Sequence, residues 1–338
     1  METCNQRSPD ISIVLRTDNP DTKANAVNDT PRRSRKPKKT IANARLKAAQ
    51  HLHALVVSSV SLMGLVVALT LLILGNPIGL VEIGLFVGCT FVIGIGTSVG
   101  FHRYFTHRSF KATMPVRVIL AILGSMAAQG PLIFWVALHR LHHEHSDQPS
   151  DPHSPHFHGS GFLGLLRGLW HAHIGWTFKH EVPNATYYAN ELIKDKVISK
   201  INQMYFIWVF LGLLIPSILG GVLTRTWMGV FYGFLWGGLV RMFFWHNMVW
   251  CITSLAHVFG HRPLDSHDQS TNNFWLAIPT LGESWHNNHH AFPHSAITGF
   301  EWWQFDLSGW IIRALEGSGL AWDVKVPTKS MIKTKTIA

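Results

Sequence analysis

Charged side chains are scarce in this chain. Of its 338 residues, 14% are Asp, Glu, Lys or Arg, whereas 47% are hydrophobic. Soluble globular domains carry about 25% charged residues. The composition therefore excludes an ordinary soluble domain and favours a membrane protein.

Cysteine is also rare. The chain has only Cys4, Cys89 and Cys251, which share no close spacing. Disulfide frameworks and thiolate metal sites both need cysteines in recurring, closely spaced pairs. Neither is expected here.

Long apolar stretches are abundant instead. At 1.5 Å per residue, about twenty helical residues cross the roughly 30 Å of hydrocarbon in a bilayer. The turns between successive stretches are very short, so we predict two helical hairpins. The four stretches are Leu55–Leu74, Ile78–Val99, Met204–Val222 and Trp227–Trp245.

The first fifty residues are basic and polar. They hold eleven Lys or Arg against five Asp or Glu, and they lack the apolar region of a signal peptide. The positive-inside rule places this end in the cytoplasm. We predict a disordered basic cytoplasmic tail over residues 1–50, a membrane domain over residues 51–327 and a C-terminal tail over residues 328–338.

The chain has 22 histidines, and eight of them fall into three compact groups. On a helix, positions i, i+3 and i+4 lie within about 100° of arc, so each His-x-x-His-His motif can direct three rings to one side. The first pair is spaced i, i+5, about 140° apart on a regular helix, which requires a distorted helix end. The groups are His102 and His107; His139, His142 and His143; and His286, His289 and His290.

A shared metal site explains this grouping. Clustered imidazoles repel one another when protonated, but neutral imidazole is a good ligand for iron, copper or zinc. Sharing requires all three groups to lie on one side of the membrane. The apolar stretch Val116–Val136, interrupted at Gln129–Pro131, must then not cross. We predict four spans, both termini inside, and Val116–Val136 in or dipping into the inner leaflet.

Three motifs, GFHRYFTHRSF, WVALHRLHHEHSDQPSDPHSP and GESWHNNHHAFPHSA, resemble the histidine boxes of the integral-membrane fatty acyl desaturases. The resemblance is to bacterial-type members of the Δ9, stearoyl-CoA-desaturase-like branch, and it runs from about Leu55 to Pro327. It implies an all-α integral membrane fold: four transmembrane helices in two hairpins, with a cytoplasmic helical cap that holds a histidine-ligated di-iron site. The implied location is a bacterial inner membrane.

The resemblance also implies the chemistry and the ligands. Two irons use O2 and two electrons to place a cis double bond, at Δ9, in a saturated acyl chain. The stretch CITSLAHVFGHRP supplies His257 as a ninth ligand, and Thr253 replaces the asparagine that usually holds an iron-bound water. The family arrangement suggests His102, His107, His139, His143 and His290 on one iron, and His142, His257, His286 and His289 on the other.

Other side chains are expected to support the site. Asp147, Asp151 and Glu283 are candidates to orient the ligand rings through their distal N–H groups. Trp135 and Trp250 are expected in the wall of an apolar acyl tunnel, and His261 in the cap near the acyl head group.

The family resemblance and the sequence also indicate which molecules the protein would bind. The fatty acyl substrate could be carried by CoA, acyl carrier protein or a glycerolipid. Because no His-Pro-Gly-Gly haem signature of cytochrome b5 is present, we expect a separate electron donor, such as a ferredoxin or rubredoxin with its reductase. The membrane is an expected partner and nucleic acid is not.

The sequence leaves two alternatives to the desaturase function open. A di-iron lipid hydroxylase, or a desaturase of another acyl position, shares the same boxes. A metal transporter would need polar or ionisable residues along its spans. The predicted spans hold almost none, with Glu82 near the outer end of the second span as an exception.

Overall fold

The computed structural model describes residues 38–179 and 181–337, and this part of the chain is mostly helical. The α-helices are α1 Ala44–Ile73, α2 Leu80–Ile95, α3 Met114–Ser125, α4 Leu132–His145, α5 Gly161–His173, α6 Ala185–Tyr188, α7 Asn190–Lys194, α8 Lys196–Gln203, α9 Tyr205–Thr224, α10 Trp227–Tyr232, α11 Arg241–Ser254, α12 His286–Ala291, α13 Leu307–Gly317 and α14 Lys329–Lys335. Two π-helices, η1 Gly96–Thr106 and η3 Gly233–Val240, and three 3-10 helices, η2 Gly175–Phe178, η4 Leu255–His257 and η5 Phe274–Leu276, complete the set.

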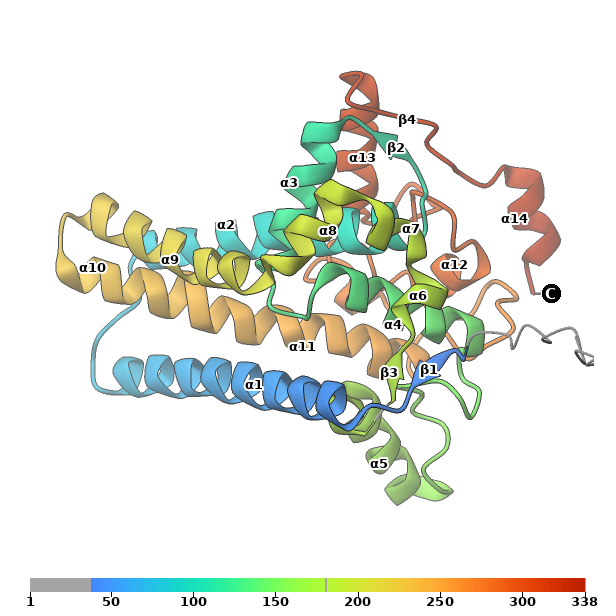
Figure 1. The fold of residues 1–338 in the computed structure, drawn as a ribbon, viewed down its shortest axis with the longest axis horizontal. Coiled ribbons are helices and arrows are strands. Elements are labelled where there is room, and N and C mark those ends of the chain that lie inside the picture. Colours follow the sequence, from blue (N-terminus) through green and yellow to red (C-terminus); the bar gives the residue numbers. More distant parts are fainter. Residues whose placement is uncertain (1–37, 180, 338) are drawn as a thin grey trace, which may run out of the picture. The chain divides into compact units, whose positions relative to one another are not determined.

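Four helices in the described residues are long and apolar enough to cross a membrane, as predicted. Consecutive elements join into continuous helices, so that α2 runs into η1, and α10 runs through η3 and α11 into η4 (Figure 1). At 1.5 Å per residue, the longer ones exceed the roughly 30 Å of hydrocarbon and carry their ends beyond it. The four are Ala44–Ile73, Leu80–Thr106, Tyr205–Thr224 and Trp227–His257.

The first helix starts earlier than its apolar stretch. Asn43 caps it, because its side-chain oxygen accepts hydrogen bonds from the N–H groups of Arg45 and Leu46 at 2.9 and 3.1 Å. Residues 44–50 of the predicted tail are therefore helical, whereas residues 1–37 lie outside the described residues. At the other end, α14 occupies most of the predicted C-terminal tail.

The interrupted stretch Val116–Val136 does not form a membrane-length helix, as predicted. It forms two helices, α3 and α4, separated at Ala128 and Gly130, whose φ angles are 60° and 100°. Pro131 then precedes the first turn of α4. The 12 residues of α3 cover only about 18 Å, too little to span the bilayer.

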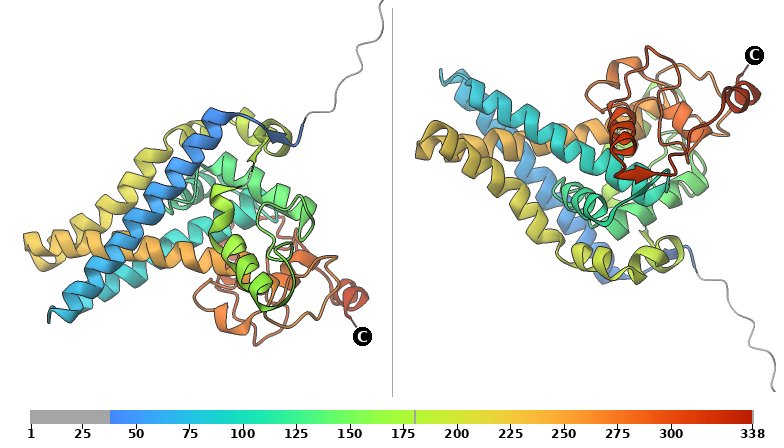
Figure 2. Two further views of the ribbon diagram at one scale, coloured as in Figure 1. Left: turned by 90° about the horizontal axis from the view of Figure 1, so that it is seen from below. Right: turned by 90° about the horizontal axis from the view of Figure 1, so that it is seen from above.

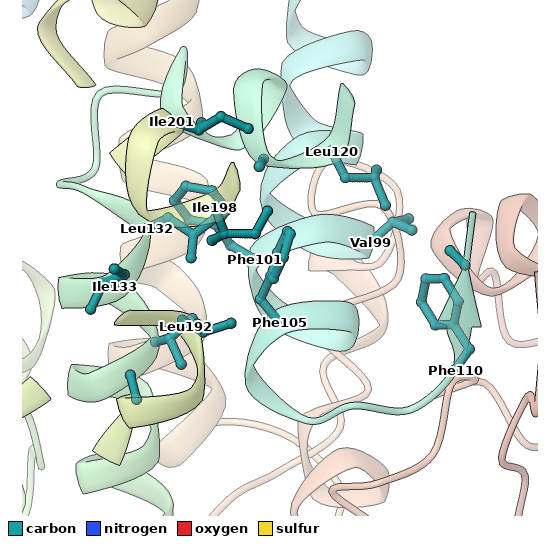
Figure 3. Close-up of a cluster of buried hydrophobic side chains, with 14 of the residues drawn as sticks. Val99, Phe101, Phe105, Phe110, Leu120, Leu132, Ile133, Leu192, Ile198 and Ile201 are labelled. Carbon is teal, nitrogen blue, oxygen red and sulfur yellow. The ribbon is translucent and has the colours of Figure 1, made fainter. Parts of the chain in front are cut away.

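A buried apolar cluster fixes the helices that carry the first two histidine groups. Figure 3 shows Phe101 and Phe105 of η1 packed beside Leu132 of α4 and Ile198 of α8. The crossing of η1 and α3 is equally tight, since a Cβ at Gly96 would meet the backbone of α3. These contacts hold η1 and α4 in one fixed orientation.

Two short antiparallel pairs of strands attach the outer segments. β1 Thr40–Ile41 pairs with β3 Val182–Pro183, and β2 Lys111–Ala112 pairs with β4 Ala321–Trp322. In both views of Figure 2 the segments after α11 gather at one end of the long helices. The third histidine group is thereby brought to the first two.

Candidate metal centre

His102 lies on the π-helix η1, and His107 caps the end of this helix. In a π-helix each N–H bonds to the carbonyl five residues earlier, and the N–H of His107 accordingly bonds to the carbonyl of His102 at 3.2 Å. The centroids of the two rings are 4.8 Å apart. The spacing i, i+5, which separates two side chains on a regular helix, here brings them together. The predicted helix distortion is therefore present.

Five imidazoles form a first group, which we call the five-histidine cluster. Their ligand nitrogens lie within 4.8 Å of one another. The Nε2 atom of His289 is 3.0 Å from the Nε2 atoms of His102 and His143. The Nε2 atoms of His139 and His107 are 3.2 Å apart. The members are His102, His107, His139, His143 and His289.

Four more imidazoles form a second group, the four-histidine cluster. The Nε2 atoms of His257 and His286 are 3.0 Å apart, and the rings of His286 and His290 are 4.3 Å apart. The two clusters touch, because His143 and His290 stack with 4.4 Å between centroids. The members are His142, His257, His286 and His290.

All nine histidines singled out in the sequence are thus brought together, but the division suggested by the family arrangement is wrong for one pair. His289 lies with the five-histidine cluster and His290 with the four-histidine cluster. The orientation of α12 is the cause. His286 and His290 share one side of this short helix, as i, i+4 residues do, whereas His289 points toward η1.

The nitrogen positions fit a metal. Two ligands about 2.1 Å from an ion, at a right angle to one another, are about 3.0 Å apart, as the Nε2 atoms of both clusters are. The Nε2 atoms of His142 and His290 are buried and have no hydrogen-bond partner among the described residues. A buried lone pair without a hydrogen-bond partner lowers the stability of the fold. A cation bound to these nitrogens would remove that penalty.

The protonation of the rings fits the same interpretation. Burial, followed by the repulsion of neighbouring imidazoles, lowers the pKa of five rings well below 6.5, so that they are neutral at physiological pH. Neutral imidazole is the form that binds metals. The five are His107, His139, His143, His286 and His289.

Carboxylates hold the outer nitrogens of three rings in the four-histidine cluster. The Nδ1 atom of His257 is 2.8 Å from Asp147, and that of His142 is 3.0 Å from Asp151. His290 bonds to Asp268 in the same way. Burial alone would raise the pKa of Asp147, but the hydrogen bond from His257 lowers it to about 2.

One carboxylate serves the five-histidine cluster. Glu283 is 2.6 Å from Nδ1 of His102 and 2.9 Å from Nε of the buried Arg103. Although burial opposes ionisation, the charge of Arg103 and the hydrogen bond from His102 lower the pKa of Glu283 to about 2. Arg103 also pairs with Asp306 at 2.8 Å. This network joins the first histidine box to the third.

The sequence identified Asp147, Asp151 and Glu283 but missed Asp268 and Arg103. Asp268 lies in a loop, 22 positions before His290, and no motif spacing connects the two residues. Arg103 lies inside the first box, yet only the fold shows that it is buried against two carboxylates.

An apolar cavity of about 360 Å³ opens onto both clusters, a volume within the range of small-molecule sites. His102 and His139 line it from one cluster, and His142 and His286 from the other. Trp135 and Trp250 also line it, as the sequence suggested, and Trp135 stacks on His139 with 5.0 Å between centroids.

Two other residues of this region were expected to support the site. His261 is exposed and lies outside the cavity wall, because Gly260, with a φ of 153°, turns the chain into a bridge with Asn272. Thr253 does line the cavity, but its hydroxyl donates to the carbonyl of Ala172 at 2.8 Å. Its hydrogen is directed at the backbone rather than at a metal-bound water.

Known proteins resemble this chain over most of its length. Residues 80–324 match the fatty acid desaturase family. The chain is 53% identical over 317 residues to the hex-5-enoyl-[acyl-carrier protein] acetylenase of Moorena producens (strain JHB), covering 92% of this chain and 98% of the relative.

Two further relatives act on longer acyl chains according to their names. An sn-1 stearoyl-lipid 9-desaturase of Anabaena variabilis is 36% identical over 239 residues, covering 70% of this chain and 80% of the relative. An acyl-CoA C20 Delta5-desaturase of Anemone leveillei is 38% identical over 238 residues, covering 69% and 70%. The chain therefore belongs to the fatty acid desaturase family and is an integral membrane oxidoreductase.

Proposed function

We propose that this chain is an O2-dependent fatty acyl desaturase whose nine histidines bind two iron ions, one in each cluster. The observation that carries the proposal is the opening of one apolar cavity onto both clusters. An unactivated methylene has no acidic proton for a base to remove. A redox metal with O2 can attack it, and iron and copper, unlike zinc, can change oxidation state.

The residues around the clusters have distinct parts in this reaction. The carboxylates Asp147, Asp151, Asp268 and Glu283 keep the proton on Nδ1 of their histidines and so direct the Nε2 lone pairs inward. The cavity wall, which includes Trp135 and Trp250, excludes water and holds the acyl chain against the site. The irons, when bound, would supply the reduction of O2 that removes two hydrogens from the chain. The balance is one CH2–CH2 unit, O2, two electrons and two protons to one CH=CH unit and two waters.

The substrate and the position of attack are the finer part of the proposal. A Δ9 desaturation of a saturated chain agrees with the histidine motifs and with the names of the 9-desaturase relatives. A second candidate is dehydrogenation of a short chain carried by acyl carrier protein. The higher identity to the acetylenase, over nearly its whole length, favours this candidate.

The remaining assignments are part of the same proposal. We place the metal clusters on the cytoplasmic side of a bacterial inner membrane, with both termini inside, and we assign residues 51–327 to the desaturase domain. Electrons come from a separate ferredoxin or rubredoxin and its reductase. The net charge of +10 would attract such a small acidic donor.

Metal analysis and product analysis test the proposal together. The purified chain should contain two irons, and it should convert one member of a panel of stearoyl-CoA, stearoyl-lipid, hexanoyl-carrier and hex-5-enoyl-carrier substrates. Mass spectrometry then distinguishes a double bond from a triple bond or an added hydroxyl. A single tightly bound zinc in protein from iron-replete cells, or a hydroxylated product, would contradict it.

A further inference from the structure

Helix α5 presents three different faces around its axis. At 100° per residue, its exposed apolar side chains fall within about 100° of arc. Its small residues, Gly164, Gly168 and Ala172, are buried on the opposite side. The exposed fractions are 71% for Phe162, 65% for Leu163, 46% for Leu166 and 68% for Trp170.

The basic residues of α5 lie at the border between these two faces. Arg167 and His171 are placed about 40° and 80° beyond the last residue of the apolar arc. Together with His158 and Lys179 they line a hollow of about 350 Å³, whose other walls include Leu166 and Trp170. None of the described residues that line it is acidic.

One polar atom in this hollow has no partner. The Nδ1 atom of His171 is buried without a hydrogen bond to any described residue, and its ring lies 4.5 Å from that of His158. The cations of this hollow are Arg167 and Lys179, and charge-assisted hydrogen bonds from such groups favour an anion. The hollow therefore has the chemistry of a phosphate site with apolar walls.

The position of α5 relates this site to the membrane. His173, at its end, hydrogen-bonds Ser254 and Asn247 on the fourth membrane-length helix, each at 3.1 Å. The following helix η2 contacts α1, and Figure 1 shows α5 below the end of α1 at which that helix starts. There α1 also exposes apolar side chains, with Leu52 61% and Leu55 55% exposed. Exposed apolar side chains of α1 and of the α5–η2 segment therefore belong to neighbouring parts of the structure.

We propose that α5 lies in the headgroup layer of the membrane, with its apolar arc among the acyl chains, and that the hollow binds the phosphate of an anionic phospholipid. A tryptophan at the boundary and basic residues beside an apolar arc are typical of interfacial helices. A soluble phosphate compound would leave Phe162 and Leu163 exposed to water. The proposal does not depend on the reaction catalysed.

Native mass spectrometry of the full chain tests the lipid site. We expect the wild type to retain phosphatidylglycerol in preference to phosphatidylcholine at equal mole fractions. The variant Arg167→Gln/Lys179→Gln should lose this preference roughly ten- to thirty-fold, since each basic residue contributes about 1 kcal/mol. A matched control, Lys329→Gln/Lys333→Gln, removes two exposed charges from α14 and should not change it. The charge-conserving Arg167→Lys/Lys179→Arg should keep the preference, which separates loss of charge from misfolding.

A depth measurement tests the position of the helix. A nitroxide at Leu163→Cys, with the three native cysteines replaced by alanine and the protein in nanodiscs, should be relaxed by oxygen and protected from a water-soluble nickel complex. The same label at Ser330→Cys should show the reverse. An unchanged lipid preference in Arg167→Gln/Lys179→Gln would overturn the proposal, as would equal nickel access at both positions. Displacement of phosphatidylglycerol by 4′-phosphopantetheine would assign the hollow to a soluble carrier instead.

Discussion

The two histidine clusters touch one another but are supported in different ways. In the four-histidine cluster, three of the four rings place Nδ1 against a carboxylate, from Asp147, Asp151 and Asp268. In the five-histidine cluster only His102 does so among the described residues, and its partner Glu283 is already paired with Arg103.

The difference shows two ways of holding a cation with neutral imidazoles. The four-histidine cluster has one nitrogen fewer but three carboxylates near it, none of which is paired with an arginine or lysine among the described residues. The five-histidine cluster has more nitrogens and, within the described part of the chain, a single carboxylate at its rings, Glu283, which is paired with Arg103. We infer that charge holds the metal in the first case and the number of ligands in the second.

The largest expected effect comes from removing one ligand from each cluster. His289→Ala leaves the five-histidine cluster with four nitrogens, and His290→Ala leaves the four-histidine cluster with three. Both variants should lose turnover. We expect His290→Ala to retain one iron per chain and His289→Ala to retain most of both, as measured by metal analysis and Mössbauer spectroscopy.

The exposed His261 provides the control, because His261→Ala should keep both irons and full turnover. If His289→Ala and His290→Ala depleted the same spectroscopic iron site, the division of these two histidines between the clusters would be wrong.

Acid should destabilise the metal-free protein strongly. In His107, His286 and His289 burial lowers the folded-state pKa well below 6.5, so the unfolded chain binds more protons below that pH. The free energy of unfolding is then at its full value above pH 6.5. It falls as the pH decreases toward the folded-state pKa values, by about 1.4 kcal/mol per pH unit for each ring.

The four-histidine cluster contributes to the same acid sensitivity. Burial lowers the pKa of His290 to about 4, although Asp268 opposes the shift. Thermal unfolding of chelator-treated protein between pH 7 and 5 should therefore be less steep in His107→Gln than in the wild type. An identical slope in the two proteins would contradict this.

The sequence predicted the histidines better than it predicted their arrangement. Motif spacing identified eight of the nine rings, because i, i+3 and i+4 positions share a helix face wherever the helix lies, and the family resemblance supplied the ninth, His257. The π-helix at Gly96–Thr106 was foreseen only as a distortion, since packing against α3 and α4 determines it. The exchange of His289 and His290 has a similar origin, because the loops around the short helix α12 determine its rotation.

Residues that act through long-range contacts were the ones missed. The partner of His290 is Asp268, on a loop without regular structure, and a single sequence gives no signal for such a contact. The four membrane helices were predictable because hydrophobic length alone identifies a span. Their true ends depend on features such as the Asn43 cap, which composition does not reveal.

Asp268→Asn tests the contribution of charge to the four-histidine cluster. The amide preserves the size of the side chain but removes the negative charge beside His290. Changes of this kind at outer-shell partners typically cost about 10- to 100-fold in metal affinity. Competition with an iron chelator should show one iron released more readily and the other unchanged.

Asp265→Asn is the matched control, because this nearby carboxylate is 61% exposed and contacts no ring of either cluster. Equal effects of the two substitutions would mean that charge around the four-histidine cluster does not determine its affinity.

The smallest effect is expected from Thr253→Val, which tests whether the four-histidine cluster depends on this hydroxyl. Thr253 donates to the carbonyl of Ala172 at 2.8 Å and lies 3.1 Å from that of Trp250, so its hydrogen is not available to a metal-bound water. Valine has the same shape and removes one hydrogen bond to the buried Ala172, which costs about 1 kcal/mol of unfolding free energy. Iron content and turnover should stay close to those of the wild type, and Thr253→Ser should restore the stability because it keeps the hydroxyl.

Thermal unfolding and single-turnover assays on the same preparations distinguish a role of the hydroxyl in stability from a role at the metal. A variant that keeps both irons and its stability but loses turnover would show that the hydroxyl serves the metal, as the usual asparagine does in the family, and that its contact with Ala172 is secondary.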